Sequence, residues 1–97
     1  MKFNGRNQVD KIKGYRELSQ HEKDLVNKVK RVEQDVLGLV EEVRTHLTQQ
    51  AAASKEQFDE AGRLARAEPQ RWASIGRTHI QEGFMALVRS ITQPEGL

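Results

Sequence analysis

The feature that most constrains the fold is an apolar repeat that begins 25 residues into the chain. Its members are Leu25, Val29, Val32, Val36, Leu39, Val43 and, close to the register, Leu47. Alternating steps of four and three place these side chains along one side of an α-helix, whereas a strand would need alternation by two. Val26, Leu37 and Val40 widen the stripe to a second side. We therefore predict a long helix over about residues 19–50 that has more than one neighbour, as in a bundle or an oligomer.

A capping box marks the start of this helix. Ser19-Gln20-His21-Glu22 has the form Ser-x-x-Glu, in which the serine oxygen accepts the backbone N–H of Glu22 and the glutamate reaches back to the Ser19 N–H. The residues before Ser19 therefore form a connector that ends near the positive end of the helix.

The rest of the chain also has helical patterns. We expect a short helix at about residues 7–13, a connector of uncertain limits over about 51–68, and a last helix over about 69–92 that Pro94 ends. The last helix carries apolar residues at helical spacing: Trp72, Ile75, Ile80, Phe84, Leu87, Val88 and Ile91. The predicted class is a single all-α domain, residues 1–97, with a short first helix followed by an antiparallel helical hairpin.

Composition limits the function classes. A chain of 97 residues, 36% hydrophobic and 31% charged, buries only a thin core alone, and self-association would relieve this. The 16 basic and 14 acidic residues leave a net charge of +2, too little for a protein that coats polymeric nucleic acid. The cations also alternate with acids along every helix, unlike a DNA-recognition helix. With no cysteine, and no apolar run near the roughly 18 residues of a membrane span, we expect a soluble intracellular protein.

The sequence offers little for catalysis. Three histidines, His21, His46 and His79, are far apart and no metal-binding motif surrounds them. Glu41 and Glu42 are adjacent, so their side chains point to different faces of a helix. We predict no enzyme, no catalytic residue, no metal site and no cofactor.

The strongest candidate for ligand binding is the connector before Ser19. Residues 11–19 read Lys-Ile-Lys-Gly-Tyr-Arg-Glu-Leu-Ser, which sets cations around a flexible Gly14 and the aromatic ring of Tyr15. This combination suits a ligand that carries both phosphates and bases. The structural alternative for Tyr15 is that its ring packs as a hydrophobic staple ahead of the capping box.

Three stretches resemble the helical-hairpin family of phage immune-evasion proteins and, within that family, the second type of anti-CBASS protein. They are residues 11–19, residues 25–30 (Leu-Val-Asn-Lys-Val-Lys) and residues 71–89, which begin Arg-Trp-Ala-Ser-Ile-Gly-Arg-Thr-His. Residues 48–68 carry no such resemblance.

The resemblance implies a sponge, a compact homohexamer of hairpins that captures cyclic dinucleotides such as 3′,3′-cGAMP without cleaving them. The host effector is then never switched on, so the protein would act in the cytoplasm of the infected bacterium. The resemblance also implies that Tyr15, beside Gly14, stacks on the bases and that Lys30 meets the phosphates. The structural alternative for Lys30 is an ordinary solvated cation.

The same resemblance implies a second pocket for cyclic trinucleotides, for which the candidates are Arg71, Arg77 and Thr78. The alternative from another class is a small helical adaptor that presents its apolar stripe to a partner protein and binds no nucleotide. Periodicity does not separate these two hypotheses, because both need the same amphipathic helices.

Overall fold

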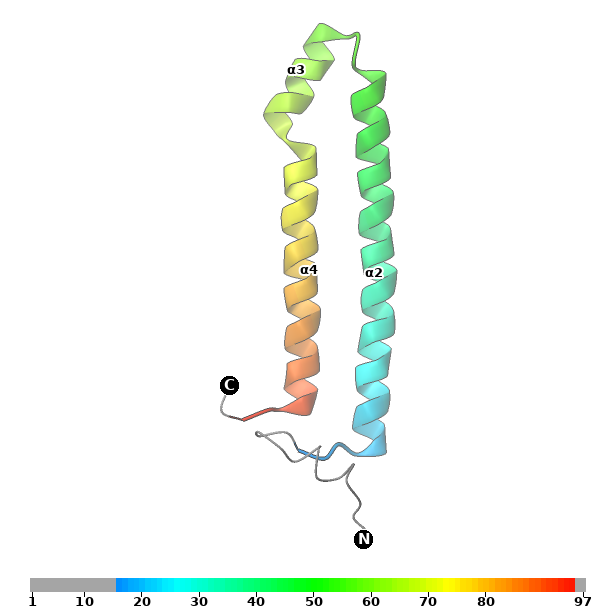
Figure 1. The fold of residues 1–97 in the computed structure, drawn as a ribbon, viewed down its shortest axis with the longest axis vertical. Coiled ribbons are helices and arrows are strands. Elements are labelled where there is room, and N and C mark those ends of the chain that lie inside the picture. Colours follow the sequence, from blue (N-terminus) through cyan, green and yellow to red (C-terminus); the bar gives the residue numbers. More distant parts are fainter. Residues whose placement is uncertain (1–15, 96–97) are drawn as a thin grey trace. The chain divides into compact units, whose positions relative to one another are not determined.

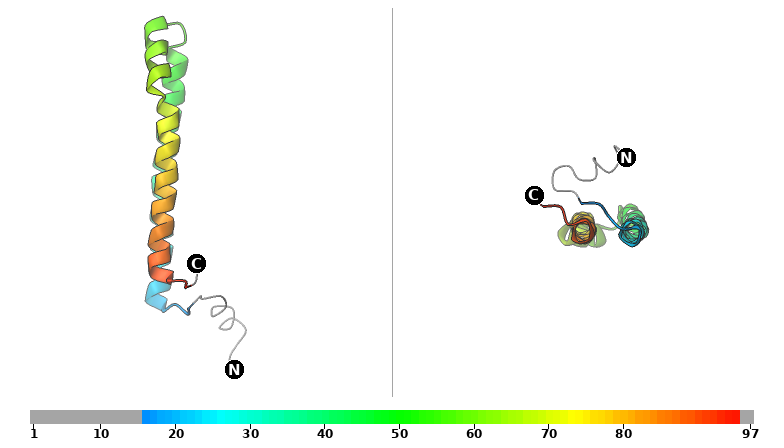
Figure 2. Two further views of the ribbon diagram at one scale, coloured as in Figure 1. Left: turned by 90° about the vertical axis from the view of Figure 1, so that its left-hand side faces the viewer. Right: turned by 90° about the horizontal axis from the view of Figure 1, so that it is seen from below.

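The computed structural model describes residues 16–95, most of which lie in three α-helices (Figures 1 and 2). Helix α2 is Gln20–Ala53, α3 is Phe58–Ala67 and α4 is Pro69–Thr92. No strand occurs between residues 16 and 95, and the predicted all-α class is confirmed. The expected short helix at about residues 7–13 lies outside the described residues.

The segment between α2 and α4 is itself largely helical. Because alanine has the highest helix propensity, α2 continues through Ala51–Ala53 and then ends in a turn at Ser54. Ser54 is only 4% exposed, and its hydroxyl donates to the Ala51 carbonyl oxygen at 3.0 Å. Helix α3 follows within residues 51–68, the range for which the sequence predicted only a connector of uncertain limits.

A left-handed residue separates α3 from α4. Glu68 has φ 51° and ψ 53°, and its N–H donates to the Leu64 carbonyl oxygen. Pro69 comes next and is the first residue of α4. Proline disfavours the right-handed α region for the residue before it and is well suited to the first helical turn, so the Glu68-Pro69 step ends one helix and starts another.

The chain divides into two units, which we describe separately. The end unit comprises the described residues 16–32 and 83–95, and the turn unit comprises residues 33–82. Helices α2 and α4 each contribute residues to both units.

In the end unit, the first part of α2 lies beside the last part of α4 (Figures 1 and 2). On the two helices of this unit, the half-buried apolar side chains are Val26, Val29, Phe84, Val88 and Ile91. They recur at helical spacing on each helix, so each helix covers one apolar face within the unit.

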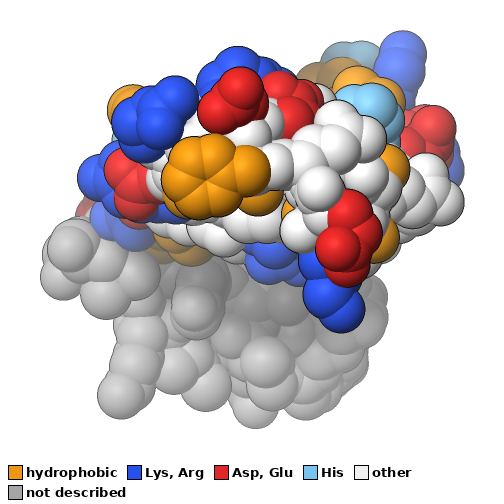
Figure 3. Space-filling view, turned by 90° about the horizontal axis from the view of Figure 1, so that it is seen from above, with side chains coloured by type: hydrophobic (Ala, Val, Ile, Leu, Met, Phe, Trp, Pro, Cys, Tyr) orange, Lys and Arg blue, Asp and Glu red, His pale blue; other side chains and the backbone are white. Residues whose placement is uncertain are grey.

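In the turn unit, polar contacts join the two long helices. Arg44 on α2 donates to the Ser74 hydroxyl at 2.7 Å, and the Gln70 amide lies 3.4 Å from the Thr48 hydroxyl. Later positions on α2 thus pair with earlier positions on α4, which is the antiparallel arrangement of a hairpin. Figure 3 looks onto the end of this unit that carries α3 and shows hydrophobic side chains at the surface among charges of both signs.

No hydrophobic side chain within residues 16–95 is fully buried, so the described chain forms no closed core. The predicted stripe of α2 is divided between two surfaces, because Val29, Val36 and Leu47 are half-buried while the other members are exposed. We call these others the exposed stripe: Leu25, Val32, Leu39 and Val43, which are 37%, 44%, 58% and 44% exposed. At 100° per residue they lie within about 40° of one another around the helix.

Candidate functional site

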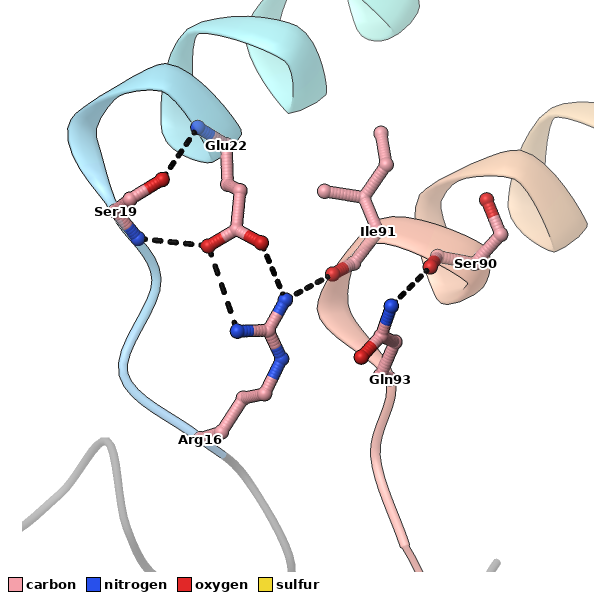
Figure 4. Close-up of polar contacts among 6 residues, drawn as sticks. All are labelled: Arg16, Ser19, Glu22, Ser90, Ile91 and Gln93. Atoms are coloured by element: carbon pink, nitrogen blue, oxygen red, sulfur yellow. Dashed lines mark hydrogen bonds and ion pairs between the residues drawn. The ribbon is translucent and has the colours of Figure 1, made fainter.

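The predicted capping box forms at the start of α2. The Glu22 N–H donates to Ser19 Oγ at 3.1 Å, and the Ser19 N–H donates to Glu22 Oε1 at 2.8 Å (Figure 4). Two backbone N–H groups that a helix start leaves without partners are thereby satisfied. The local sequence therefore fixes where α2 begins.

Arg16 adds a tertiary contact to this cap. Its Nη2 donates to Glu22 Oε2 at 2.6 Å and to the Ile91 carbonyl oxygen at 2.8 Å, while Nη1 lies 3.4 Å from Glu22 Oε1 (Figure 4). The Arg16 hydrogen bond, together with those of the capping box, lowers the pKa of Glu22 from 4.5 to about 2. The carboxylate thus remains charged through the physiological range.

We call this set of contacts the Arg16 clamp: Arg16, Glu22 and the Ile91 carbonyl group. It joins the connector, the first turn of α2 and the end of α4, all within the end unit. In the sequence, Arg16 is recognisable only as one of the cations of the connector before Ser19, and the clamp was not predicted. The separation of 75 positions in sequence between Arg16 and Ile91 leaves no local signal for that contact.

The two connector candidates, Gly14 and Tyr15, lie outside the described residues. Tyr15 is bonded directly to Arg16, the first described residue. In the sequence, the clamp therefore begins at the residue directly after the predicted stacking residue.

Lys30 is exposed on α2 in the end unit. It has no carboxylate partner within 4.0 Å among residues 16–95, unlike Arg16 and Arg63, which are both paired with glutamates. Lys30 comes eleven residues after Ser19, which corresponds to about 16 Å of helix rise. An exposed ammonium group without a carboxylate beside it can meet a phosphate without first losing a protein partner.

The three residues of the predicted second pocket do not share one face of α4. Arg71 and Thr78 are seven residues apart, so they lie on one side of the helix, whereas Arg77 lies about 100° away from Thr78. Arg71 and Thr78 are exposed and Arg77 is half-buried. The Arg71 guanidinium carbon also lies 5.3 Å from the centre of the Trp72 ring, within the range of a cation–π contact.

A groove of about 630 Å³ in the turn unit takes in one of these residues, Arg71. Its wall contains aliphatic side chains from α2 and α3, including Leu47 and Leu64, with Lys55 and Glu68 among the charged residues. Arg77 and Thr78 do not line this groove.

Arg44 is a second residue whose tertiary role was not predicted from the sequence. It is half-buried between the helices of the turn unit, and its Nε has no hydrogen-bond partner among residues 16–95. The sequence did contain a signal for this role, because the spacing of Val40, Arg44 and Leu47 places Arg44 on the same, half-buried face of α2. A charged residue on such a face commonly bonds across to a neighbouring helix, as Arg44 does to Ser74.

The described residues hold no group of three or more His, Cys, Asp or Glu side chains that could bind a metal ion. The His79 ring lies 3.6 Å from Glu82, and both side chains are largely exposed. None of the helices in the described part of the chain is long and apolar enough to span a bilayer.

Comparison with known proteins identifies the family. Residues 8–92 match the family described as "Acb2/Tad1, hairpin domain". The chain belongs to the Acb2/Tad1 hairpin family. It is also 45% identical over 105 aligned positions to "Anti-CBASS protein 2" of Pseudomonas phage JBD67, with 93% of this chain and 97% of that relative covered. The resemblance found in the sequence is thus confirmed, and the family match includes the connector, α2, α3 and α4.

Proposed function

We propose that this protein is a phage anti-CBASS sponge, which binds cyclic dinucleotides such as 3′,3′-cGAMP and releases them unchanged. In this role it acts in the cytoplasm of the infected bacterium and keeps the signal from the host effector. The observation that carries the proposal is the 45% identity to Anti-CBASS protein 2 over nearly the whole of both chains.

The proposed ligand contacts come from Tyr15, beside Gly14, and from Lys30. A cyclic dinucleotide has two bases, two phosphates and approximate two-fold symmetry, so a pocket between two copies can offer each half one ring and one ammonium group. Stacking contributes about 1–3 kcal/mol per base. The exposed, unpaired state of Lys30 among the described residues supports its part in this arrangement.

Self-association is part of the proposal, with a homohexamer as the expected form. Its physical support is the exposed stripe of α2 together with Trp72, Met85 and Leu87 on α4, which are 59%, 66% and 51% exposed. Large apolar side chains that a single chain leaves exposed, here in a row along α2, are typical of an interface between proteins.

A second pocket for cyclic trinucleotides is proposed on α4. Arg71 and Thr78, on one side of the helix, offer a guanidinium and a hydroxyl to a phosphate. Arg77, on a different side, takes part only if the pocket forms between copies, because one helix does not present all three together.

The test is titration of the purified protein with 3′,3′-cGAMP by calorimetry, followed by heat denaturation and chromatography of the released nucleotide. We expect saturable binding and intact ligand. Recovery of linear nucleotide would make the protein a phosphodiesterase. No binding at micromolar protein, combined with capture of a partner protein by a monomer or dimer, would favour the adaptor.

The site residues are tested by Tyr15→Ala and Lys30→Ala. Loss of two base stacks weakens binding by about 30-fold or more, since each 1.4 kcal/mol is a factor of ten. Lys28→Ala is the matched control, because Lys28 is also an exposed lysine of α2 but lies about 160° from Lys30 around the helix. Variants that unfold or dissociate, by circular dichroism and native mass, would identify packing residues instead.

A further inference from the structure

Phe58, the first residue of α3, is the large apolar side chain that the described chain covers least, since it is 91% exposed. From that position the ring contributes little to the stability of a single chain, because it keeps nearly all of its contact with water. Leu64 of the same helix is half-buried in the turn unit and lies about 120° from Phe58 around the helix. Helix α3 thus has one side that packs on its own chain and another that residues 16–95 leave uncovered.

The side of α3 that carries Phe58 combines one large ring with small residues. We call it the α3 face: Phe58, Ala61, Gly62 and Ala65, which lie within an arc of about 100° around the helix. A helix face without bulky side chains beyond the ring lets a second helix come close. Ala61 and Ala65 also line the groove of about 630 Å³ in the turn unit. The α3 face therefore has a protruding ring at one end and an apolar recess at the other.

A ring and a recess on one helix face fit a second copy of the same face. When two identical helices pack antiparallel, with a two-fold axis beside residues 61 and 62, Phe58 of each copy lies opposite Ala65 of the other. We propose that α3 pairs in this way with α3 of a second copy of the chain, so that each Phe58 ring is seated against the partner's Ala61 and Ala65. The pair buries both rings that the single chain leaves in water.

The charges beside the α3 face are complementary in the same arrangement. Asp59 and Arg66 are seven residues apart, so they lie on one flank of the helix, and both line an open hollow of about 850 Å³ with Phe58. Residues on the same flank face each other in an antiparallel pair, so Asp59 of each copy meets Arg66 of the other. Neither has an ion-pair partner within 4.0 Å among residues 16–95. Arg66 Nη1 lies 3.3 Å from the place that a Cβ on Gly62 would occupy, so the guanidinium already lies beside the α3 face.

The area of the α3 pair limits what it does alone. An aromatic side chain buries about 150–250 Å², so two rings supply about 300–500 Å². A stable interface between proteins buries about 1,200–2,000 Å². The α3 pair therefore adds to association through the exposed stripe of α2 and does not replace it. The contact needs no nucleotide, so this inference is independent of the proposed ligand.

Cysteine cross-linking tests the register of the pair, because the sequence contains no cysteine. Ala61→Cys places the thiols of two copies beside the two-fold axis, where the Cα atoms come within the roughly 4.4–6.8 Å of a disulfide. Ala65→Cys separates them by seven residues along the pair, which is about 10 Å. On non-reducing gels we expect Ala61→Cys to cross-link at least about 10-fold faster than Ala65→Cys. Ala67→Cys is the matched control for random collision, because Ala67 is exposed on the opposite side of α3 from Phe58.

Phe58→Ala in the Ala61→Cys protein tests the part played by the ring. The substitution should leave the single chain folded, because the ring is 91% exposed. We expect cross-linking to slow by at least about 10-fold, since the pair loses the burial of two rings. An unchanged rate would mean that Phe58 has no place in a contact between copies.

Charge reversal tests the flank of the pair in the same Ala61→Cys background. Asp59→Arg and Arg66→Asp should each slow cross-linking several-fold, because each sets like charges opposite one another in both halves of the pair. The two changes together should restore the rate, which a merely structural role would not do. Circular dichroism of each variant shows whether helix content is retained.

Three results would overturn the proposal. The first is cross-linking of Ala61→Cys no faster than that of Ala67→Cys, which would show that α3 does not meet a second copy. The second is equally fast cross-linking of Ala61→Cys and Ala65→Cys, which a parallel pair would produce. The third is a double charge reversal that reacts no faster than the single ones.

Discussion

Leu39→Glu is the most direct test of whether the exposed stripe of α2 joins copies of the chain. Leu39 is 58% exposed, more than any other member of the stripe. Glutamate has a helix propensity close to that of leucine, so the substitution should leave α2 itself intact. Any large effect of the substitution on self-association must then come from the loss of an apolar contact that the single chain does not make.

The size of the effect follows from the exposed fraction. Full burial of a leucine side chain contributes about 1.5–3 kcal/mol, so covering the exposed 58% contributes about 1–2 kcal/mol per chain. A contact that uses Leu39 from two chains loses about 2–4 kcal/mol, which is about 30- to 1000-fold in the association constant. Burial of an unpaired carboxylate adds to this loss.

Sedimentation velocity and native mass spectrometry over a range of protein concentrations measure the outcome. We expect the wild type to be an oligomer over this concentration range. We expect Leu39→Glu to be mostly monomeric under the same conditions. Gln34→Glu is the control, because Gln34 is also exposed on α2 but lies about 140° away around the helix. A Leu39→Glu protein with the same mass distribution as the wild type would refute the reasoning.

Two further predictions concern stability. Because the pKa of Glu22 is lowered from 4.5 to about 2, its charged form stabilises the fold above pH 4.5 and that contribution is lost as the pH falls from about 4.5 to about 2. The difference in unfolding free energy between the wild type and Glu22→Gln, from urea titrations, should therefore shrink across this window, and a constant difference would contradict the assignment. Glu68→Gly should raise the melting temperature by several degrees, because a left-handed conformation (φ 51°) costs a residue with a Cβ about 1 kcal/mol and costs glycine almost nothing. A lower melting temperature in a thermal scan at fixed protein concentration would show that Glu68 makes a compensating contact.

The parts of the fold that depend on neighbouring residues were predictable. The Ser19-x-x-Glu22 motif predicted both hydrogen bonds of the capping box, and both form. Pro69 starts α4, as expected of a proline after a helix end. Caps and helix propensities act within about one helical turn, so the sequence alone contains the relevant partners.

The location of α3 was less predictable. Its apolar pattern is weak and Gln57, at its N-cap, makes no side-chain capping bond, so the sequence carries no strong start signal. Of the candidate site, the sequence predicted that Lys30 lies on the long helix, but it did not predict that Arg16 pairs with Glu22. That ion pair depends on the path of the chain before α2, unlike the Glu60–Arg63 pair, which follows the i,i+3 spacing of a helix.

By itself, the sequence determined the helical class, the start of α2 and the aromatic and cationic character of the connector, because each of these depends on residue type and short-range spacing. The tertiary structure alone decided which side of α2 is covered by the chain, since Val29 and Val36 are half-buried while Leu25 and Leu39 are exposed, although all four belong to one repeat. It also decided that Arg16 bonds to Ile91, 75 residues away. Contacts between residues so far apart in sequence depend on how helices pack. The helical period predicts which residues share a face of a helix, but not which face meets a neighbour.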